Sequence, residues 1–274
     1  MDGFHVAIAT WPLSLPLPIT VGLCVGLSAL VSAAWVAVLH RADRWAKGGP
    51  RGDWPASLLW LTFRVYTRLV HHVRFVGREH IPPGRHGLFT PLAHPKSPDR
   101  DPTGAAGPVV VICNHTAGID PLLVQSACRF EIRWIMMQEM NVGPMRWLSR
   151  FASIILVNQD GRDLGPTRDA LRHLRKGGAI GIFPEGRIAR PPGTILPFEA
   201  GAGYLIAKSR AVVLPVWISG TPSGMQAWDS IIKPSRSRVE FGSPMQFDSS
   251  QSPEEIVATL EETLQRMSGW ARSS

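Results

Sequence analysis

An uncharged apolar segment near the N-terminus constrains the structure of this chain more than any other feature of its sequence. The segment runs from Ile19 to Leu39, and its 21 residues include no Asp, Glu, Lys or Arg. As an α-helix it would extend roughly 30 Å, which matches the hydrocarbon thickness of a bilayer. We therefore predict a membrane helix. A re-entrant or interfacial hairpin is the alternative, because Pro12, Pro16 and Pro18 precede the segment.

The flanks of this segment distinguish an anchor from a cleaved signal peptide. A signal peptide begins with basic residues, whereas this chain begins with MDGFH and has no Lys or Arg there. Arg41, Arg44, Lys47 and Arg51 follow the segment. Positive residues beside a membrane helix tend to stay on the cytoplasmic side. We expect the segment to be retained, with the catalytic domain on the cytoplasmic side of the membrane.

A basic amphipathic helix is predicted after the anchor, in WPASLLWLTFRVYTRLVHHVRF. Its apolar residues recur every three or four positions, at Leu58, Leu61, Val65, Leu69 and Val73. Arg64, Arg68 and His71 follow the same period on another face. Such a helix can lie on an anionic membrane surface, and the alternative is a surface helix packed on its own domain. We assign residues 1–72 to membrane-anchoring helices and residues 73–274 to a second domain.

From residue 73 onward, short apolar runs alternate with helical stretches. The runs are VRFVG, PVVVIC, IRWIMM, ASIILV, GAIGIF, AVVLPVWI and SRVEFG. Several are apolar at every position, as expected for strands of a sheet covered on both sides. Helices are expected near residues 121–129, 143–151, 165–176 and 200–209, and a final helix begins at Ser252 with a capping box. This alternation predicts an α/β domain with a mostly parallel mixed sheet flanked by helices.

Composition excludes several classes of function. The chain has 274 residues, and 29 Lys and Arg against 21 Asp and Glu give it a net charge of +8, which suits an anionic partner. It contains no recognisable nucleic-acid-binding module, so we predict no nucleic acid partner. Its three cysteines lack the spacing of a zinc site or a disulfide framework, and no glycine-rich phosphate loop is present. Residues 84–108, rich in Pro and Gly, are expected to form a surface loop.

A candidate general base follows the apolar strand VVVIC. The sequence NHTAGID places Asn114 and His115 at the end of this strand and Asp120 five residues after the histidine. Within one regular helix, five steps would turn these two side chains about 140° apart. If the chain instead turns at HTAG, with Gly118 in an unusual conformation, and a helix begins at Asp120, the two side chains can meet. Alone, His115 is explained more simply as a loop residue, and Asp120 as the residue that starts a helix. Together they can act as a general base and the carboxylate that orients it.

A second group of polar residues ends the strand in GAIGIFPEGR. Glu185, Gly186 and Arg187 follow this strand directly. If the strands are parallel, the carboxylate and the guanidinium reach the same edge of the sheet as His115. The planar donors of arginine suit phosphate. The alternative is a tight turn with a solvated Glu–Arg pair.

The ordered set of NHxxxxD, FPEG and the apolar VVLPVWI resembles the glycerolipid acyltransferase family, which includes the 1-acyl-sn-glycerol-3-phosphate acyltransferases. The resemblance covers roughly residues 73–220. It implies transfer of a fatty acyl group from acyl-CoA or acyl-carrier protein to the free hydroxyl of a lysophospholipid. It also implies that His115 is the base and that Asp120 orients its ring. Asn114, Glu185 and Pro215 fall on substrate-binding motifs, as does Gly186, and no metal or other cofactor is implied.

The sequence departs from the family pattern at positively charged positions. The family reads FPEGTRS where this chain reads FPEGRIAR, so Arg187 or Arg190 must replace the usual arginine. The second motif usually ends in arginine, whereas ILVNQDGRD carries its arginine three residues later, at Arg162. Glu199 stands where members usually carry lysine. These losses leave open another lyso-lipid acceptor, such as an aminolipid or glycolipid intermediate.

Two further alternatives concern the mechanism and the class of protein. Cys113 lies two residues before His115, which on a strand puts both side chains on one face, so an acyl-cysteine route is conceivable. A small thiol in an apolar strand is more often a packing residue. The chain could also be a non-catalytic lipid-binding module, although such a module does not need His115.

Overall fold

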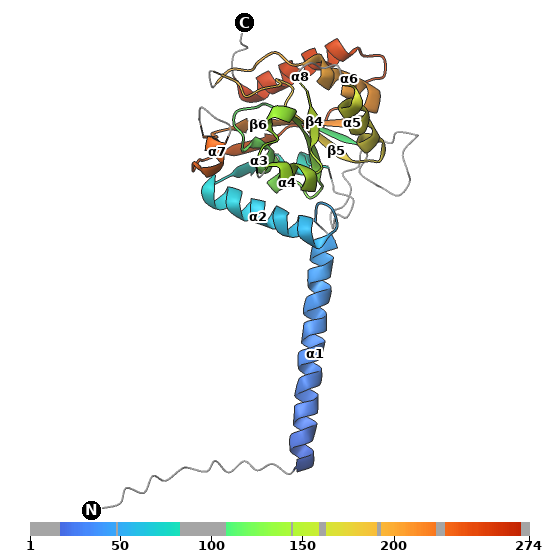
Figure 1. Ribbon diagram of the computed structural model, residues 1–274, viewed down its shortest axis with the longest axis vertical. Coiled ribbons are helices and arrows are strands. Elements are labelled where there is room, and N and C mark those ends of the chain that lie inside the picture. Colours follow the sequence, from blue (N-terminus) through green and yellow to red (C-terminus); the bar gives the residue numbers. More distant parts are fainter. Residues whose placement is uncertain are drawn as a thin grey trace, which may run out of the picture. The chain divides into compact units, whose positions relative to one another are not determined.

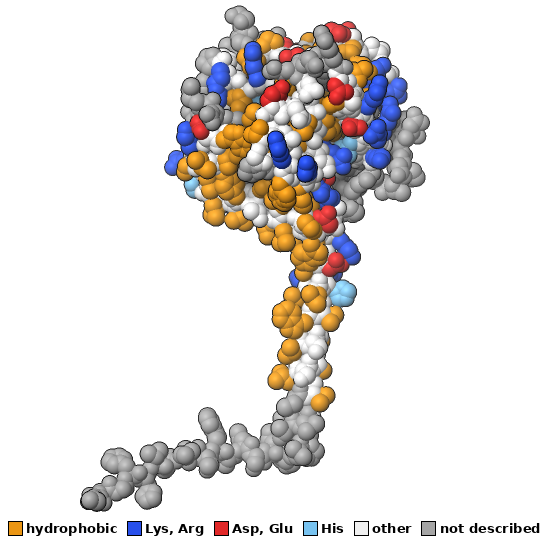
Figure 2. All heavy atoms as spheres, viewed as in Figure 1, with side chains coloured by type: hydrophobic (Ala, Val, Ile, Leu, Met, Phe, Trp, Pro, Cys, Tyr) orange, Lys and Arg blue, Asp and Glu red, His pale blue; other side chains and the backbone are white. Residues whose placement is uncertain are grey.

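The N-terminal segment forms one long helix, α1 (Leu17–Lys47), which contains the whole uncharged stretch. The computed structural model describes residues 17–47, 49–82, 108–143, 145–158, 163–190, 193–222 and 228–269. Over Val25–Lys47, α1 is long and apolar enough to cross a membrane. Large apolar side chains along it, such as Leu30 and Trp35, are exposed. Figure 2 shows hydrophobic side chains on the surface of this helix. By length and composition, α1 agrees with the predicted membrane segment.

The boundary between the two compact units of the chain lies earlier than the sequence predicts. The units are residues 1–45 and 46–274, rather than a division at residue 72. The difference arises because α2 (Trp54–Val70) packs against α3 (Asp120–Ala127) in the second unit. The inner face of α2 is buried there, Trp60 included. The amphipathic helix therefore belongs with the α/β domain rather than with the anchor.

The second unit is built on one seven-stranded sheet with the order β1-β7-β6-β2-β5-β3-β4 (Figure 1). The strands are β1 (Arg74–Val76), β2 (Val109–Cys113), β3 (Ile132–Met137), β4 (Ile155–Val157), β5 (Ala179–Ile182), β6 (Val212–Ser219) and β7 (Arg238–Phe241). Strands β6 and β7 are antiparallel, and the other neighbouring pairs are parallel. The predicted mixed, mostly parallel sheet is confirmed. The predicted loop at 84–108 lies outside the described residues except for Pro108.

Helices cover both faces of this sheet. Besides α2 and α3, they are α4 (Met145–Phe151), α5 (Gly165–Arg175), α6 (Ala200–Ser209), α7 (Asp229–Ile232) and α8 (Pro253–Ser268), with the 3-10 turns η1 (Arg78–His80) and η2 (Gln138–Met140). The core against α3 contains Val111 and Cys113 of β2, and the core against α5, α6 and α8 contains Val110 and Ile112. A strand whose residues alternate between two cores must be apolar throughout. The predicted capping box at Ser252 is present at the start of α8.

The outer face of α2 exposes the apolar stripe that the sequence predicts. Leu58, Leu61, Val65 and Leu69 are between 42% and 69% exposed. Figure 2 shows hydrophobic side chains gathered on the side of the α/β unit that α2 occupies. A helix packed only on its own domain would turn this stripe inward. The exposed stripe is therefore a surface suited to an apolar environment.

Two residues at the end of this pattern lie elsewhere than predicted. His71, expected on the basic face, is fully buried, with Nδ1 2.9 Å from Ser235 Oγ and Nε2 3.2 Å from Tyr66 Oη. Val73, expected on the apolar stripe, is buried in the core. The reason is that α2 ends at Val70, so its period does not extend to either residue.

Candidate active site

The loop after β2 folds back so that the predicted base meets its carboxylate. His115 Nδ1 lies 3.0 Å from Asp120 Oδ2, and α3 begins at Asp120 as predicted. The same carboxylate oxygen accepts the backbone N–H groups of Thr116 at 2.7 Å and Ala117 at 2.8 Å. These bonds shape the turn, and Gly118, where we expected an unusual conformation, does not have a positive φ. Asp120 is completely buried. Through these hydrogen bonds its carboxylate both fixes the loop and orients the His115 ring.

The hydrogen bonds of His115 determine which ring nitrogen can act as a base. The Asp120 carboxylate already accepts two backbone N–H groups, so the proton between it and His115 belongs on Nδ1. The lone pair is then on Nε2, to which no described residue is hydrogen-bonded. The His115 side chain is 18% exposed and stacks on Phe183, with ring centroids 4.1 Å apart. The ring can therefore accept a proton from a hydroxyl group that reaches it.

The segment after β5 is hydrogen-bonded to both the backbone N–H and the backbone carbonyl of His115. The His115 N–H donates to Glu185 Oε1 at 2.8 Å, and the Ala189 N–H donates to the His115 carbonyl at 2.9 Å. The other Glu185 oxygen accepts the Leu196 N–H at 3.0 Å. Burial raises the pKa of the Glu185 carboxyl, and the two N–H donors act in the opposite direction. Because both oxygens are engaged with backbone, these contacts favour a positioning role over the expected substrate contact.

The predicted glycine and two of the predicted arginines lie at the same edge of the sheet as His115. Gly186 has a φ of +67°, which ends the turn after β5 and which glycine adopts most easily. Gly186 and Arg187 line a cavity that also reaches His115. Arg190 Nη1 lies 3.4 Å from the Thr116 carbonyl oxygen. Arg162 lies outside the described residues.

Asn114 and Pro215 lie inside the sheet, where substrate contact is not supported. The Asn114 side chain donates to the Ile218 carbonyl at 2.9 Å and accepts the Ile218 N–H at 2.7 Å. This pair of bonds ties the end of β2 to β6 and uses both polar atoms of the amide. Pro215 is buried in the middle of β6. Neither residue lines the cavity.

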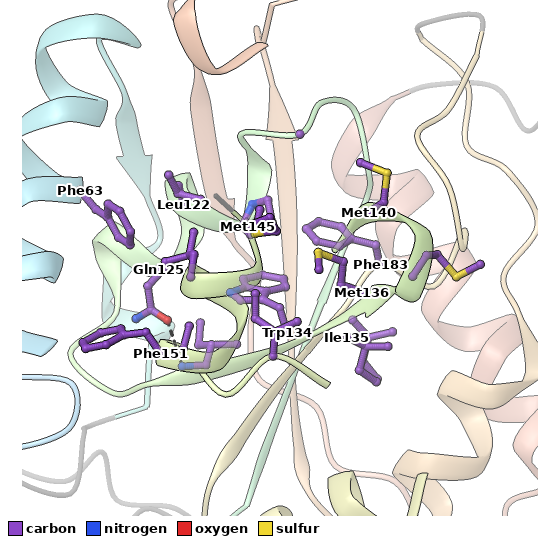
Figure 3. A pocket seen from close by; sticks show the side chains of 18 of the residues that line it. Phe63, Leu122, Gln125, Trp134, Ile135, Met136, Met140, Met145, Phe151 and Phe183 are labelled. Atoms are coloured by element: carbon purple, nitrogen blue, oxygen red, sulfur yellow. Dashed lines mark hydrogen bonds between the residues drawn. The ribbon is translucent and has the colours of Figure 1, made fainter. Parts of the chain in front are cut away.

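The cavity at His115 is large and mostly apolar, with a volume of about 530 Å³. Residues of α2, β3 and α4 contribute to its wall, including Phe63, Trp134, Met136, Met145 and Phe151 (Figure 3). Because β3 runs along the wall, the cavity extends from the carboxyl ends of the strands, where His115 lies, toward their amino ends. Arg51 and Glu131, which form an ion pair, also line it. A space of this size and lining suits a long aliphatic chain.

The sequence did not reveal the aromatic part of this wall. Phe183 stacks on His115 on one side and on Trp134 on the other, with ring centroids 4.9 Å apart in the second pair. Trp134 lies opposite Gly181 in β5, and a Cβ atom at Gly181 would be only 2.4 Å from the Trp134 ring. The only local signal is a glycine in an otherwise apolar strand, which indicates close approach of another group.

The position of Cys113 argues against an acyl-cysteine route. Its side chain is completely buried in the core and does not line the cavity. Burial raises the pKa of the Cys113 thiol well above its usual value. The reactive form of cysteine is the thiolate, which this environment disfavours.

Comparisons with known proteins agree with this architecture. The profile of the family described as Acyltransferase matches residues 72–219 of this chain, an interval that includes both motifs of the site. A similar solved structure is the crystal structure of the 1-acyl-sn-glycerophosphate (LPA) acyltransferase, PlsC, from Thermotoga maritima. The two chains are 21% identical with a TM-score of 0.57, over 78% of this chain and 82% of that one. At this identity the likeness establishes a shared fold.

Proposed function

Since this chain is an acyltransferase that belongs to the Acyltransferase family, we propose that it transfers a fatty acyl group from an acyl thioester to the free hydroxyl of a lysophospholipid such as 1-acylglycerol-3-phosphate. The donor is acyl-CoA or acyl-carrier protein, and the reaction uses no bound cofactor. One observation carries the proposal: the hydrogen-bonded His115–Asp120 pair lies at a long apolar cavity.

In the proposed mechanism His115 acts as a general base. Nε2 takes the proton of the acceptor hydroxyl while the hydroxyl oxygen attacks the thioester carbonyl carbon. Asp120 stabilises the imidazolium that forms. The new C–O bond replaces the C–S bond, and the proton passes from His115 to the leaving thiolate. The products are an ester and a free thiol.

We further propose that α2 lies at an anionic membrane surface on the cytoplasmic side. The outer face of α2 exposes Leu58 and Leu61, and its inner face contributes Leu59, Trp60 and Phe63 to the cavity wall. An aliphatic chain could therefore pass from the lipid into the cavity without crossing water. This arrangement would avoid the unfavourable hydration of the chain.

A second acceptor class is favoured by the position of Glu199. A Cβ atom at Gly186 would lie 3.4 Å from Glu199 Cγ, so this acidic side chain is close to the edge of the cavity. A carboxylate there repels a phosphate monoester and attracts an ammonium group. An aminolipid or another zwitterionic lyso-lipid is therefore the alternative acceptor.

The proposed function is tested by release of free thiol from the purified full-length chain in detergent. Acyl-CoA or acyl-carrier protein is mixed with lysophosphatidic acid, lysophosphatidylethanolamine or a lyso-glycolipid. We expect thiol release that depends on one of these acceptors, together with the matching diacyl product. If no acceptor stimulates thiol release from either donor, the proposed function is wrong.

Substitution of Arg187 tests the contact with the acceptor head group. Arg187→Ala is expected to raise KM for lysophosphatidic acid about tenfold and to change kcat little, because a charge contact made equally in ground and transition states affects binding alone. The KM for a neutral lyso-glycolipid should change much less. Arg175→Ala, at an exposed position on α5, is the control. An equal effect on charged and neutral acceptors would contradict the assignment.

A further inference from the structure

The Phe183 ring lies flat against one face of the His115 imidazole. The two ring centroids are 4.1 Å apart, and the ring planes differ by only 20°. Phe183 is the first residue after β5, and its carbonyl accepts the Gly186 N–H at 3.1 Å, which fixes its backbone at the start of the turn. The face of a phenyl ring carries negative charge density and attracts a cation that lies over it within about 6 Å. The His115 imidazole lies inside this range.

A second aromatic ring prevents Phe183 from turning its edge toward His115. Trp134 stacks on Phe183 with ring centroids 4.9 Å apart and an interplanar angle of 15°. Trp134 in turn lies against Gly181 of β5, where a Cβ atom would come within 2.4 Å of the indole ring. Figure 3 shows Phe183 and Trp134 together in the cavity wall. The face of Phe183 is therefore held toward His115 before any substrate arrives, so it needs no reorganisation during the reaction.

This contact gains strength during the proposed reaction. While the imidazole is neutral, the stacked phenyl ring contributes packing. When Nε2 takes the proton of the acceptor hydroxyl, the imidazole becomes a cation, and its attraction to the phenyl face is added. The His115 side chain is only 18% exposed, so water screens this attraction little. An interaction that is stronger in the transition state than in the ground state lowers the barrier.

Asp120 and Phe183 contact the imidazole in different directions. Asp120 is hydrogen-bonded to Nδ1 at 3.0 Å, and the same carboxylate oxygen accepts the backbone N–H groups of Thr116 and Ala117. Its negative charge is therefore shared among three donors. Phe183 lies over the face of the ring and leaves both ring nitrogens accessible to their own partners. The phenyl face can thus stabilise the imidazolium in addition to the carboxylate.

We infer that Phe183 is a positioning residue that stabilises the protonated form of His115 through its ring face during acyl transfer. This inference rests on the proposed function and adds a residue to its mechanism. The plainer role of Phe183 is to fill the cavity wall, which it also lines. The two roles differ in one property, because packing depends on the shape of the ring, whereas attraction to a cation depends on its electron density.

Fluorinated phenylalanines at position 183 separate these two roles. Fluorine withdraws electron density from the ring face and changes the size of the ring little. In the full-length chain in detergent, we expect kcat to fall stepwise from the unmodified chain to the mono-, di- and trifluorinated forms. The total decrease should be about tenfold, as for loss of a desolvated cation–π contact. The acceptor KM should stay constant, because the contact strengthens only as the proton moves.

The same replacements at Phe241 are the matched control, because Phe241 is buried in β7 and does not line the cavity. They should leave kcat unchanged. Phe183→Leu, which keeps an apolar side chain but has no aromatic face, should lower kcat at least as far as the trifluorinated ring does. Equal kcat values along the series at position 183, or a raised acceptor KM with constant kcat, would overturn the inference.

A chemical modification separates this inference from the proposed function. Diethyl pyrocarbonate acylates a neutral imidazole nitrogen, and positive charge develops on the ring as the new N–C bond forms. Mass spectrometry gives the rate at His115 relative to the rate at the exposed His72. We expect this ratio to fall in the same order along the fluorinated series, and a constant ratio would contradict the inference. Because the reagent replaces both lipid substrates, the result is informative even if no thiol release is observed.

Discussion

His115→Ala is expected to lower kcat for acyl transfer by a factor of about 10²–10⁴, which is the usual contribution of a general base. The variant should fold normally, because the buried Asp120 carboxylate keeps the backbone N–H groups of Thr116 and Ala117. The acceptor KM should change little, since the ring acts on the proton rather than on the head group. Lysolipid-dependent thiol release measures the effect.

His72→Ala provides the matched control, because His72 is exposed in the loop after α2. It should leave kcat and KM unchanged. Asp120→Asn should approach the effect of His115→Ala, because an amide cannot stabilise the imidazolium as a carboxylate does. Undiminished turnover by His115→Ala would remove the proposed mechanism, although the acyltransferase fold would remain.

Glu185→Gln is expected to reduce both kcat and the free energy of unfolding. The two carboxylate oxygens of Glu185 accept one backbone N–H each, from His115 and Leu196. An amide has only one oxygen, so its NH₂ group must face one of these donors. The mismatch should cost about 1–3 kcal/mol in stability, as for other buried donors left without an acceptor. The displaced His115 backbone should lower kcat about tenfold or more, since small misplacements of a base are costly.

The kinetic pattern of Glu185→Gln separates two roles. A positioning residue affects kcat and leaves the acceptor KM nearly unchanged, whereas loss of an acceptor-binding residue raises KM. Urea denaturation measures the stability change. Glu262→Gln, at an exposed position on α8, should stay within about 0.5 kcal/mol of the unmodified chain. A raised KM with normal stability would restore the substrate contact that the family resemblance implied.

Local patterns in the sequence were sufficient to predict strands and helix starts of the α/β domain. The wholly apolar run Val109–Cys113 predicted a strand with both faces covered, and its residues do alternate between two cores. The capping box at Ser252 and the helix start at Asp120 were also correct. These signals are readable because the period of side chains and the bonding of caps depend on residues within a few positions of one another.

Patterns near the ends of elements were less informative. The helical period assigned to residues 58–73 suggested that His71 and Val73 faced outward with the rest of α2. Both are buried because the helix stops at Val70 and the chain then enters the core. The packing of α2 on α3 likewise moved the unit boundary from residue 72 to residue 45. A helix boundary carries little periodic signal, so tertiary contacts prevail there.

The residue types at the strand ends were enough to predict a general base, the carboxylate that orients it, and arginines beside them. This was possible because the carboxyl ends of parallel strands lie at the same edge of a sheet. Which group each polar side chain is hydrogen-bonded to could be determined only from the folded structure. Glu185 meets the His115 backbone across 70 positions, and Asn114 meets Ile218 across 104. Hydrogen bonds over such separations exist only once the strand order is set, and no local pattern encodes that order. The aromatic part of the cavity wall, in which Phe183 stacks on both His115 and Trp134, is a product of the same long-range packing.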